Sequence, residues 1–453
     1  MTIQRRVAPF VMELLTSSRA RALRRTQASL ARRLRGRPRE VHYFHQADDP
    51  YSALAAQTLR ALTDRYDIAL RPHLVAPPSD AAAPERALLE AFARRDAADV
   101  ARAYWLTFRA DASAPKPDAV ARAQRVLTRA ISEGSFGQHA APTSAALWSA
   151  DRFALATLAA ELGEATDSET SAALVEGTAL RERLGHYLGA MFFYAGEWYW
   201  GVDRLHHLER RLIDEGAAQG TAPSAFIAPR PVPTRAASAA STATNGKAGD
   251  SVVLEYFPSL RSPYTYIVTE RVYALAKHYG VALVLRPVLP MVMRGLPVPR
   301  AKQLYIARDT KREAEEAGIP FGRVCDPVGR PVERALSLFP WARDRGRAGE
   351  LLIEFMRAAW SQGVDTGTDA GLRLAVERAG LDWNQALKHV DRDDGWRAEL
   401  EVNRAELFAL GLWGVPSFRV RGGGATEYAT WGQDRLWRVE DELRARIPRA
   451  AAR

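Results

Sequence analysis

The stretch Val252–Thr265 reads VVLEYFPSLRSPYT and decides the fold. Its first half is a run of β-forming residues that ends at Pro258, which predicts a short strand. Ser262 followed by Pro263 is a frequent helix start, with serine as the N-cap and proline at the first helical position. The apolar residues that follow recur with helical periodicity up to Gly280. The stretch therefore predicts a strand that leads directly into a helix.

The residues after this helix extend the pattern to a whole domain. Val281–Leu285 is a second short apolar run and completes a parallel βαβ unit with a right-handed crossover. Helical sequence is expected over 300–412. Two short runs, Phe418–Val420 and Tyr428–Trp431, are separated by three glycines and predict a hairpin, and Gln433–Arg446 predicts a closing helix. This order of elements is that of a thioredoxin fold with an inserted helical subdomain.

The first half of the chain repeats the pattern of the second. Tyr43-Phe44 matches Tyr256-Phe257 at an offset of 213 residues, and Trp200–Leu205 matches Trp431–Leu436 at an offset of 231 residues. The order of the matches is preserved, which indicates a duplication. The predicted fold class is therefore α/β, with two tandem thioredoxin-like domains that each carry an inserted helical subdomain.

The first copy has the same predicted elements. Strands are expected at Val41–Phe44 and Ile68–Leu70, with one helix over Pro50–Tyr66 between them. A hairpin that turns at Ala195-Gly196 and a closing helix from Val202 complete the copy.

Composition divides the chain into four segments. Residues 216–250 are rich in Ala, Ser, Thr, Pro and Gly and predict a flexible linker. We expect a basic helical arm over 1–39, a degenerate thioredoxin-like domain over 40–215, and a thioredoxin-like domain with intact site motifs over 251–447. We also hypothesise that the two copies pack as an intrachain pseudo-dimer.

The positive charge of the chain is concentrated at its start. The net charge is +10, and residues 1–40 hold eleven Arg against two acidic residues, Glu13 and Glu40. The rest of the chain is almost neutral, which argues against a specific nucleic-acid partner for the domains. A hydrophobic fraction of 47% is typical of a globular protein. No apolar run reaches the roughly 18 residues that a membrane-spanning helix needs.

The basic arm predicts a helix from Gln4 to about Leu34. We interpret it first as a solvated helix packed on the first domain. An Arg-rich amphipathic helix can also bind an anionic surface such as a membrane or nucleic acid, and an Arg-rich, acid-poor leader resembles an organelle transit peptide. The arm lacks the continuous apolar core of a secretory signal.

The single cysteine, Cys325, excludes a disulfide within the chain, a CxxC redox pair and a thiolate zinc site. Its turn-like surroundings lack a nearby base, so we expect a structural thiol. A cytoplasmic location fits this cysteine usage. The histidines His42, His45 and His206-His207 lack the i, i+4 spacing of a zinc pair, so no metal site is predicted.

Three motifs of the second copy lie where chemistry is expected. Ser262 caps a helix start, and a helix N-terminus also stabilises an anion such as a thiolate. Val415-Pro416 precedes the third strand, where a cis bond would turn the Val415 backbone outward to pair with a peptide-like ligand. Asp434-Arg435 opens the last helix and recurs as Asp203-Arg204, which suggests at least a structural role.

These motifs resemble 2-hydroxychromene-2-carboxylate isomerases and kappa-class glutathione transferases, a branch of the DsbA-like thioredoxin family. Ser-Pro-Tyr after a Tyr-Phe strand, Gly-Val-Pro-Ser-Phe and Trp-Gly-Gln-Asp-Arg-Leu carry the resemblance. Lys302, Tyr305, Asp309 and Arg312 add to it. The resemblance covers residues 250–445 well and residues 40–214 weakly.

The resemblance implies glutathione as a cofactor and a small organic acid, plausibly aromatic, as the substrate. Ser262 would be the catalytic residue that holds the glutathione thiolate. Val415 would pair with the peptide backbone of glutathione, and Gln433-Asp434 would bind its γ-glutamyl end. The cofactor-binding residues implied in this way are Pro263, Tyr264, Val415, Pro416, Gln433, Asp434 and Arg435. The implied reaction is a glutathione-dependent isomerisation or transfer.

The first copy departs from these motifs. Asp49 stands where the second copy has Ser262, and a carboxylate there would repel a thiolate. Gly189-Ala190-Met191 stands in place of Val415-Pro416-Ser417 and has no proline. We therefore expect the first domain to be a structural partner.

Two other functions remain open at this point. The chain could be a DsbA-family oxidoreductase homologue, although the lack of a CxxC argues against dithiol exchange. It could also be a non-catalytic scaffold that binds a partner through its thioredoxin surface and its basic arm.

Overall fold

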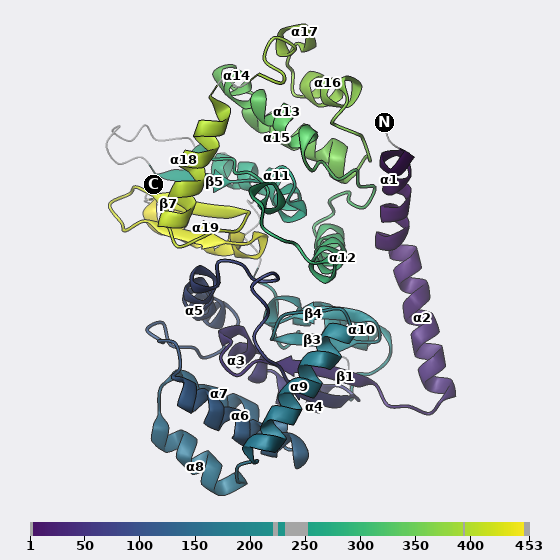
Figure 1. The fold of residues 1–453 in the computed structure, drawn as a ribbon, viewed down its shortest axis with the longest axis vertical. Helices are drawn as coiled ribbons and strands as arrows, with labels where there is room; N and C mark the ends of the chain where they lie inside the picture. Colours follow the sequence, from purple (N-terminus) through teal and green to yellow (C-terminus); the bar gives the residue numbers. More distant parts are fainter. Residues whose placement is uncertain (1–2, 221–224, 232–251, 393–394, 448–453) are drawn as a thin grey trace, which may run out of the picture. The chain divides into compact units, whose positions relative to one another are not determined.

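Each half of the chain folds its short apolar runs into one four-stranded sheet (Figure 1). The computed structural model describes residues 3–220, 225–231, 252–392 and 395–447. By contact the chain forms two units, residues 22–231 and residues 1–21 with 232–453. We call them the N-terminal unit and the C-terminal unit. The expected mixed α/β class is confirmed.

The helices of the N-terminal unit come before, between and after the strands of its sheet. In chain order its elements are α2 (Ser18–Leu34), β1 (Glu40–His45), α3 (Pro50–Ala56), α4 (Leu59–Arg65), β2 (Ala69–Leu74), α5 (Arg86–Ala103), α6 (Pro117–Ser132), α7 (Phe136–Trp148), α8 (Arg152–Leu162), α9 (Asp167–Arg183), β3 (Met191–Tyr194), β4 (Glu197–Trp200), the short 3-10 helix η1 (Val202–Arg204) and α10 (Leu205–Asp214).

The C-terminal unit follows the same order with more helices in its middle. Its elements are α1 (Ile3–Thr16), β5 (Val253–Phe257), α11 (Pro263–Tyr279), β6 (Ala282–Leu285), η2 (Met291–Arg294), α12 (Arg300–Glu316), α13 (Arg330–Ser337), α14 (Phe339–Asp344), α15 (Ala348–Trp360), α16 (Asp369–Arg378), α17 (Trp383–Ala386), α18 (Trp396–Ala409), β7 (Ser417–Arg421), β8 (Tyr428–Trp431), η3 (Gln433–Arg435) and α19 (Leu436–Arg446).

The two sheets share one topology. Their strand orders are β2-β1-β3-β4 and β6-β5-β7-β8. In each sheet the first two strands are parallel and the last two form an antiparallel hairpin. Phe44 is opposite Met191 in the first sheet, and Phe257 is opposite Ser417 in the second. This register gives the two sheets corresponding positions, which the candidate site depends on.

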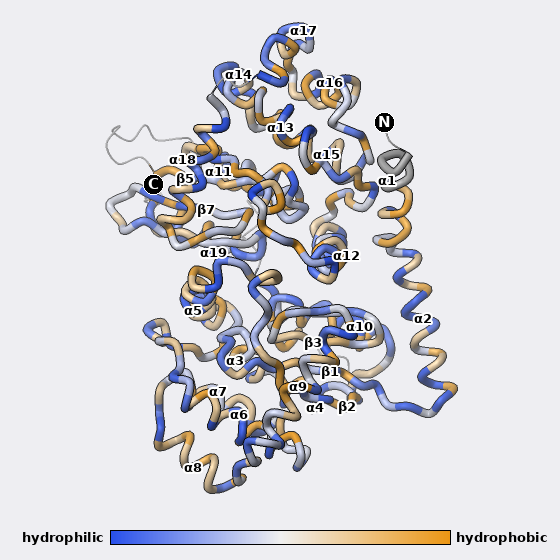
Figure 2. Tube along the Cα trace, viewed as in Figure 1, coloured by the Kyte–Doolittle hydropathy of each residue, from blue (hydrophilic) through white to orange (hydrophobic). Residues whose placement is uncertain are grey.

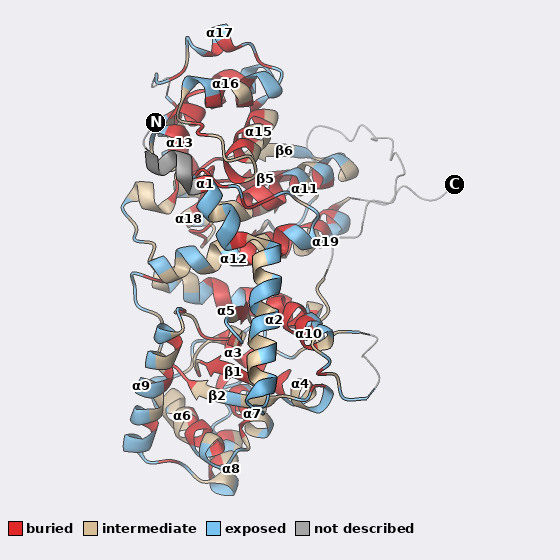
Figure 3. Ribbon diagram, turned by 90° about the vertical axis from the view of Figure 1, so that its right-hand side faces the viewer, coloured by how far each residue is buried: buried red, intermediate tan, exposed pale blue. Residues whose placement is uncertain are grey.

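Each unit has its own hydrophobic core beside the central strand of its sheet (Figure 3). The core of the N-terminal unit includes Tyr43 and Phe192, and that of the C-terminal unit includes Tyr256 and Phe418. β5 is buried along its whole length, as expected of a central strand covered on both faces. Among the described residues, no helix is long and apolar enough to cross a membrane.

The expected single helix over Pro50–Tyr66 is instead two helices, α3 and α4. The break falls at Gln57 and Thr58. The Thr58 hydroxyl donates to the Ala55 carbonyl at 2.7 Å, and the Gln57 amide donates to the Ala53 carbonyl at 3.2 Å. Side chains that bond to nearby carbonyls compete with the helical hydrogen bonds, which explains the break.

Strand β2 is longer than the expected Ile68–Leu70 because it continues through Pro72 to Leu74. The strand lies at the edge of its sheet, where the missing N–H of a proline leaves no partner unsatisfied. Its counterpart β6 ends at Leu285, before Arg286-Pro287, as predicted.

The basic arm was expected to be one helix packed on the first domain. The single helix is wrong, and the placement on the first domain holds only from Ala22 onward. The arm breaks at Ser17, whose side chain accepts from the Ala20 N–H at 3.3 Å and so begins α2. Residues up to Arg21 belong to the C-terminal unit, where the Phe10 ring lies 5.1 Å from the Arg323 guanidinium carbon. In the N-terminal unit, Arg25 forms a two-bond ion pair with Glu197 at 2.6 and 2.7 Å. Figure 2 shows hydrophilic stretches along α2.

The expected linker is shorter than 216–250 at its N-terminal side. Ala217 and Ala228 are fully buried, and Ala218 forms a β-bridge with Tyr66. The Ile227 N–H donates to the Glu209 carboxylate at 3.0 Å. These apolar residues are sufficient to hold 216–220 and 225–231 in the N-terminal unit. Residues 221–224 and 232–250 of the expected linker lie outside the described residues.

Candidate functional site

The start of α11 forms as the Ser-Pro sequence predicts. Ser262 has extended backbone angles, and its Oγ accepts a hydrogen bond from the Thr265 N–H at 3.2 Å. Pro263 takes the first helical position. Ser262 is partly exposed, and no acceptor for its hydroxyl proton occurs among the described residues. The Ser262 hydroxyl can therefore donate to a ligand while it caps the helix.

The loop before β7 contains the expected cis peptide bond between Val415 and Pro416. The Pro416 carbonyl accepts from the Gly432 N–H at 2.9 Å, and the Ser417 hydroxyl donates to the Gly414 carbonyl at 2.8 Å. In the described part of the chain, neither the N–H nor the C=O of Val415 has a hydrogen-bond partner. Because Ser417 at the start of β7 pairs with Phe257 at the end of β5, this loop lies beside the end of the strand that leads to Ser262.

Two tryptophans and a lysine surround the same loop. Trp413 and Trp431 have ring centroids 5.2 Å apart, and a Cβ at Gly414 would lie 2.0 Å from the Trp431 ring. Only glycine fits at position 414. The Lys302 ammonium lies 5.7 Å from the centroid of the Trp413 ring, and burial lowers the pKa of Lys302 to about 8. Lys302 therefore brings a cation that is still mostly protonated at pH 7 to this loop.

The structure separates the roles of Gln433 and Asp434. Gln433 is buried, and its Nε2 donates to Glu313 at 2.6 Å and also to Asp434. Its Oε1 accepts from Arg271 at 3.4 Å. The amide of Gln433 is thus fully engaged within the unit and orients the Asp434 carboxylate. Arg435 is buried beside them.

The Tyr264 hydroxyl donates a hydrogen bond to Asp309 at 2.8 Å, and this bond gives the side chain a structural role. Asp309 also forms a buried ion pair with Arg312 at 2.9 Å. These contacts tie α11 to α12, and they account structurally for Asp309 and Arg312 of the motif that begins at Lys302.

Two buried polar atoms near the helix start were not singled out from the sequence. Ser259 Oγ and Trp413 Nε1 are buried, and neither has a hydrogen-bond partner among the described residues. Ser259 precedes the Ser262 cap in the same turn, in which the Ser262 N–H donates to the Ser259 carbonyl at 2.9 Å. A serine or a tryptophan in a loop has no pattern that would distinguish it, so the sequence could not identify these atoms.

Cys325 is buried, and its N–H donates to the Ala359 carbonyl at 2.8 Å. Its place in the core agrees with the expected structural thiol.

In the N-terminal unit the corresponding helix start is occupied by a carboxylate. Asp49 Oδ2 accepts from the Ser52 N–H at 2.9 Å and from the Ser52 hydroxyl at 2.7 Å, and Oδ1 accepts from the Tyr51 N–H at 3.2 Å. Burial raises the pKa of Asp49 to about 6, against the lowering effect of these hydrogen bonds. The carboxylate therefore uses the backbone donors that an external anion would need.

The loop before β3 closes against the same helix start. The Ala190 N–H donates to Ser52 Oγ at 2.9 Å, and a Cβ at Gly189 would lie 3.2 Å from Asp49 Oδ2 and 2.7 Å from Gln46 Cβ. By strand register Ala190 corresponds to Pro416, which has no N–H to form this bond. The loop is thus bonded to the helix in the N-terminal unit and is not bonded in this way in the C-terminal unit.

The contacts that support the two helix starts correspond in detail. The Tyr51 hydroxyl donates to Asp96 at 2.8 Å, as the Tyr264 hydroxyl donates to Asp309 at 2.8 Å. The Gly201 N–H donates to the Ala190 carbonyl, as the Gly432 N–H donates to the Pro416 carbonyl. The two units therefore differ in the residue at the helix start but share the hydrogen bonds that support it.

Comparisons with known proteins found one matching family model and several similar solved structures. Residues 253–444 match the model of the DSBA-like thioredoxin domain. The chain is similar to a solved 2-hydroxychromene-2-carboxylate isomerase, with 20% identity over 43% of this chain and 95% of that chain, at a TM-score of 0.35. It is similar to a probable DsbA oxidoreductase from Streptomyces coelicolor, with 19% identity, coverages of 45% and 93%, and a TM-score of 0.33. It is also similar to the cytosolic disulfide reductase DsbM from Pseudomonas aeruginosa, with 21% identity, coverages of 43% and 100%, and a TM-score of 0.31. No curated protein sequence matches the chain.

Proposed function

We propose that residues 253–444, which match the model of the DSBA-like thioredoxin domain, bind glutathione at the start of α11 and act as a glutathione-dependent isomerase or transferase. The proposed substrate class is a small, ring-bearing organic acid. One observation carries the proposal: at the N-terminus of a 17-residue helix, the partly exposed Ser262 hydroxyl has no acceptor for its proton among the described residues. Bound glutathione would supply a nucleophilic thiolate at this position.

Ser262 and α11 would stabilise the negative charge of that thiolate. A hydroxyl donates a hydrogen bond to a thiolate, and the N-terminal amides of a helix carry a partial positive charge. Both effects favour the ionised form, so the pKa of the bound thiol would fall. Ser262 cannot form a disulfide, which is why the proposal is addition and release of the thiolate and not dithiol exchange.

The backbone of Val415 would hold the peptide part of the ligand. Its N–H and C=O are without a partner in the described part of the chain. They resemble in this respect the unpaired backbone groups on the outer side of an edge strand. An extended peptide can add to such a pair through two hydrogen bonds. Because Val415 is part of the loop before β7, which lies beside the end of β5, the peptide and the thiolate would be held by one domain.

Charged groups near the loop complement the two ends of glutathione. Lys302, over the Trp413 ring, would attract a carboxylate of the ligand. Asp434, oriented by the Gln433 amide, would pair with the α-amino group of the γ-glutamyl end. We accordingly assign Gln433 a positioning role and Asp434 the contact with the ligand.

Calorimetric titration of glutathione into the full chain tests the proposal. We expect binding of micromolar to millimolar strength in the wild type and a large loss in Ser262→Ala. Thr368→Ala is the matched control, because Thr368 caps α16 in the same unit through a 3.1 Å bond from the Gly371 N–H. Loss of either cap costs about 1 kcal/mol of stability, so equal thermal midpoints with unequal binding would separate the site from the fold.

Two results would overturn the proposal. Absence of glutathione binding in the wild type would favour a non-catalytic scaffold over a glutathione-dependent enzyme. Turnover in an insulin-reduction assay would instead favour an oxidoreductase, in which the lone Cys325 would have to act with an external thiol.

A further inference from the structure

Helix α2 ends in a hydrogen-bonded C-cap that presents two arginines. Gly36 has a φ of +58°, its N–H donates to the Arg33 carbonyl at 3.0 Å, and the Arg37 N–H donates to the Arg32 carbonyl at 3.1 Å. This is the Schellman pattern. Arg32 Nη1 also donates to the Arg37 carbonyl at 3.3 Å. The backbone therefore holds Arg35 and Arg37 on either side of Gly36.

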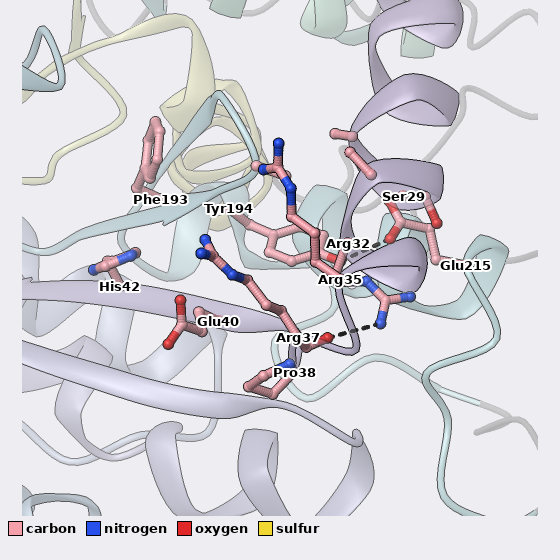
Figure 4. Close-up of a pocket in the computed structure, with 13 residues that line it drawn as sticks. Ser29, Arg32, Arg35, Arg37, Pro38, Glu40, His42, Phe193, Tyr194 and Glu215 are labelled. Atoms are coloured by element: carbon pink, nitrogen blue, oxygen red, sulfur yellow. Dashed lines mark hydrogen bonds between the residues drawn. The ribbon is translucent and has the colours of Figure 1, made fainter.

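A cavity of about 340 Å³ that is open to solvent on one side lies beside this C-cap, within the N-terminal unit. Its wall is formed by the end of α2, by His42 of β1, and by Phe193 and Tyr194 of β3 (Figure 4). Figure 4 shows the side chains of Arg35 and Arg37 extending toward the side on which Phe193 and His42 lie. The volume falls in the range of about 300–1,000 Å³ that is typical of small-molecule sites.

The two carboxylates of the cavity wall are engaged by cations that do not line it. Glu40 Oε1 accepts from Arg71 Nη2 at 2.8 Å and from Arg71 Nε at 3.0 Å. Glu215 Oε1 accepts from Arg211 Nε at 3.0 Å, and its Oε2 accepts from the Tyr194 hydroxyl at 2.7 Å. These pairs neutralise the acidic part of the wall.

The two arginines that extend into the cavity have no such compensation. Within residues 22–231 as described, the guanidinium groups of Arg35 and Arg37 have neither an ion-pair nor a hydrogen-bond partner. The carbonyls of Arg32 and Arg33, which would repel an anion at a helix C-terminus, are occupied by the C-cap bonds. The cavity therefore has an excess of positive charge.

The opposite wall is aromatic. Phe193 and His42 face each other across β1 and β3, with ring centroids 6.2 Å apart at an angle of 60°. His42 Nδ1 lies 2.9 Å from His73 Nε2, and burial lowers the pKa of His42 below its ordinary value, so the ring is neutral at pH 7. Phe193 and a neutral imidazole form a surface that suits a flat ring.

From this combination we infer that the cavity binds a small organic phosphate that carries an aromatic ring, such as a mononucleotide. A phosphate monoester carries a charge of roughly −1.5 to −2 at pH 7, which two guanidinium groups can match. Arginine also suits phosphate geometry because its N–H groups can bind two oxygens at once. Arg35 and Arg37 hold the phosphate, and Phe193 packs on the ring. The site is separate from the proposed glutathione site and does not depend on it.

Titration of adenosine monophosphate into the full chain tests the inference, with adenosine and inorganic phosphate as partial probes. We expect the nucleotide to bind more tightly than either partial probe. The double variant R35Q/R37Q should weaken nucleotide binding about tenfold or more, since hydrogen bonds between charged groups are lost. Both residues are exposed, so the variant should fold as the wild type does. Phe193→Leu should weaken the nucleotide and leave inorganic phosphate unchanged.

Arg33→Gln is the matched control, because Arg33 is an exposed arginine of the same turn that does not line the cavity. The control should bind the nucleotide as the wild type does. Equal losses in Arg33→Gln and in the double variant would overturn the inference in favour of general charge attraction. Equal affinities for inorganic phosphate and the nucleotide would overturn the proposed packing of the ligand ring on Phe193. Tighter binding of a single-stranded RNA than of the nucleotide would indicate a nucleic-acid surface instead. Glutathione titration of the double variant, expected to be unchanged, keeps this test independent of the proposed function.

Discussion

The starts of α3 and α11 occupy corresponding places, after the central strand of a four-stranded sheet, yet they use the helix N-terminus differently. At α3 the Asp49 carboxylate takes up the free backbone N–H groups and the Ser52 hydroxyl. At α11 the Ser262 Oγ accepts one N–H, and its own proton has no acceptor in the described part of the chain. The polar groups at the start of α3 are thus hydrogen-bonded within the protein, whereas the Ser262 hydroxyl at the start of α11 can still donate a hydrogen bond.

The loops that face these helix starts differ in the same sense. Ala190 has an N–H and uses it to bond to Ser52 Oγ at 2.9 Å. Pro416 has none, and the N–H and C=O of its neighbour Val415 are unpaired within the residues that the structure describes. Under the proposed function, the comparison teaches that a binding site on this fold is made by leaving polar groups of the framework without internal partners. In the N-terminal unit, the Asp49 carboxylate and the Ala190 N–H are sufficient to occupy these polar groups.

The largest expected effect comes from placing the acid of the first helix start in the second. Ser262→Asp should weaken glutathione binding by roughly fivefold to a thousandfold, since like charges about 4 Å apart cost about 1 kcal/mol in water and about 4 kcal/mol at an effective dielectric of 20. Calorimetry at pH 7 measures the loss. Ser262→Thr, which keeps the hydroxyl, should retain most of the affinity.

The reverse exchange supplies the control. Asp49→Ser in a Ser262→Ala background should bind no glutathione, because Gly189 and Ala190 still pack against Ser52 and Gln46. Recovery of binding in this double variant would show that the residue at the helix start alone makes the site.

The next effect concerns the close packing at α3. Gly189→Ala should lower the stability of the N-terminal unit by about 1–3 kcal/mol, because the new Cβ would lie within 2.7 Å of Gln46 Cβ. Thermal unfolding followed by circular dichroism measures the change. Gly137→Ala in α7 is the matched control, since its Cβ would meet nothing closer than 4.0 Å and the helix should gain slightly. Unchanged stability in Gly189→Ala would mean that the loop is not packed on the helix start.

The smallest effect is the pH dependence that Asp49 imposes. Its pKa of about 6 in the folded state lies above the value of about 3.9 in an unfolded chain, so the folded state binds the proton more tightly. The contribution of Asp49 to stability is then fully present below about pH 4 and is lost as the pH rises through 6. Asp49→Asn should raise stability at pH 7 by about 1–2 kcal/mol and flatten this part of the profile. Urea unfolding between pH 4 and pH 7 measures both, with Asp48→Asn as the control; a profile that Asp49→Asn leaves unchanged would contradict the assigned burial of the carboxylate.

Much of the fold could be predicted because local signals and tertiary packing agree. Helix α11 begins at Pro263 and ends at Tyr279 as expected, since Ser262 caps one end and Gly280, at a φ of +63°, caps the other. The prediction was wrong where a rule depends on tertiary position. Pro72 did not end β2, because an edge strand tolerates a missing N–H, and edge position is not visible in a local pattern.

The candidate site could be predicted in part. The cis bond at Val415-Pro416 is confirmed, and the position of Ser262 at the helix start follows from its sequence context. The engagement of Gln433 by Glu313 depends on a residue 120 positions away, which spacing cannot reveal. The roles of Ser262, Val415 and Asp434 toward glutathione stay predictions.

The tyrosine–carboxylate pairs that anchor both helix starts suggest how such a protein could be redesigned. Tyr51 with Asp96 and Tyr264 with Asp309 fasten each helix to its neighbour at the same distance of 2.8 Å, whichever residue stands at the tip. A library of variants confined to the loops at 46–49 and 189–190 would leave these anchors intact. Selection from such a library for new ligands could then convert the N-terminal unit into a second, independently chosen receptor on the same chain.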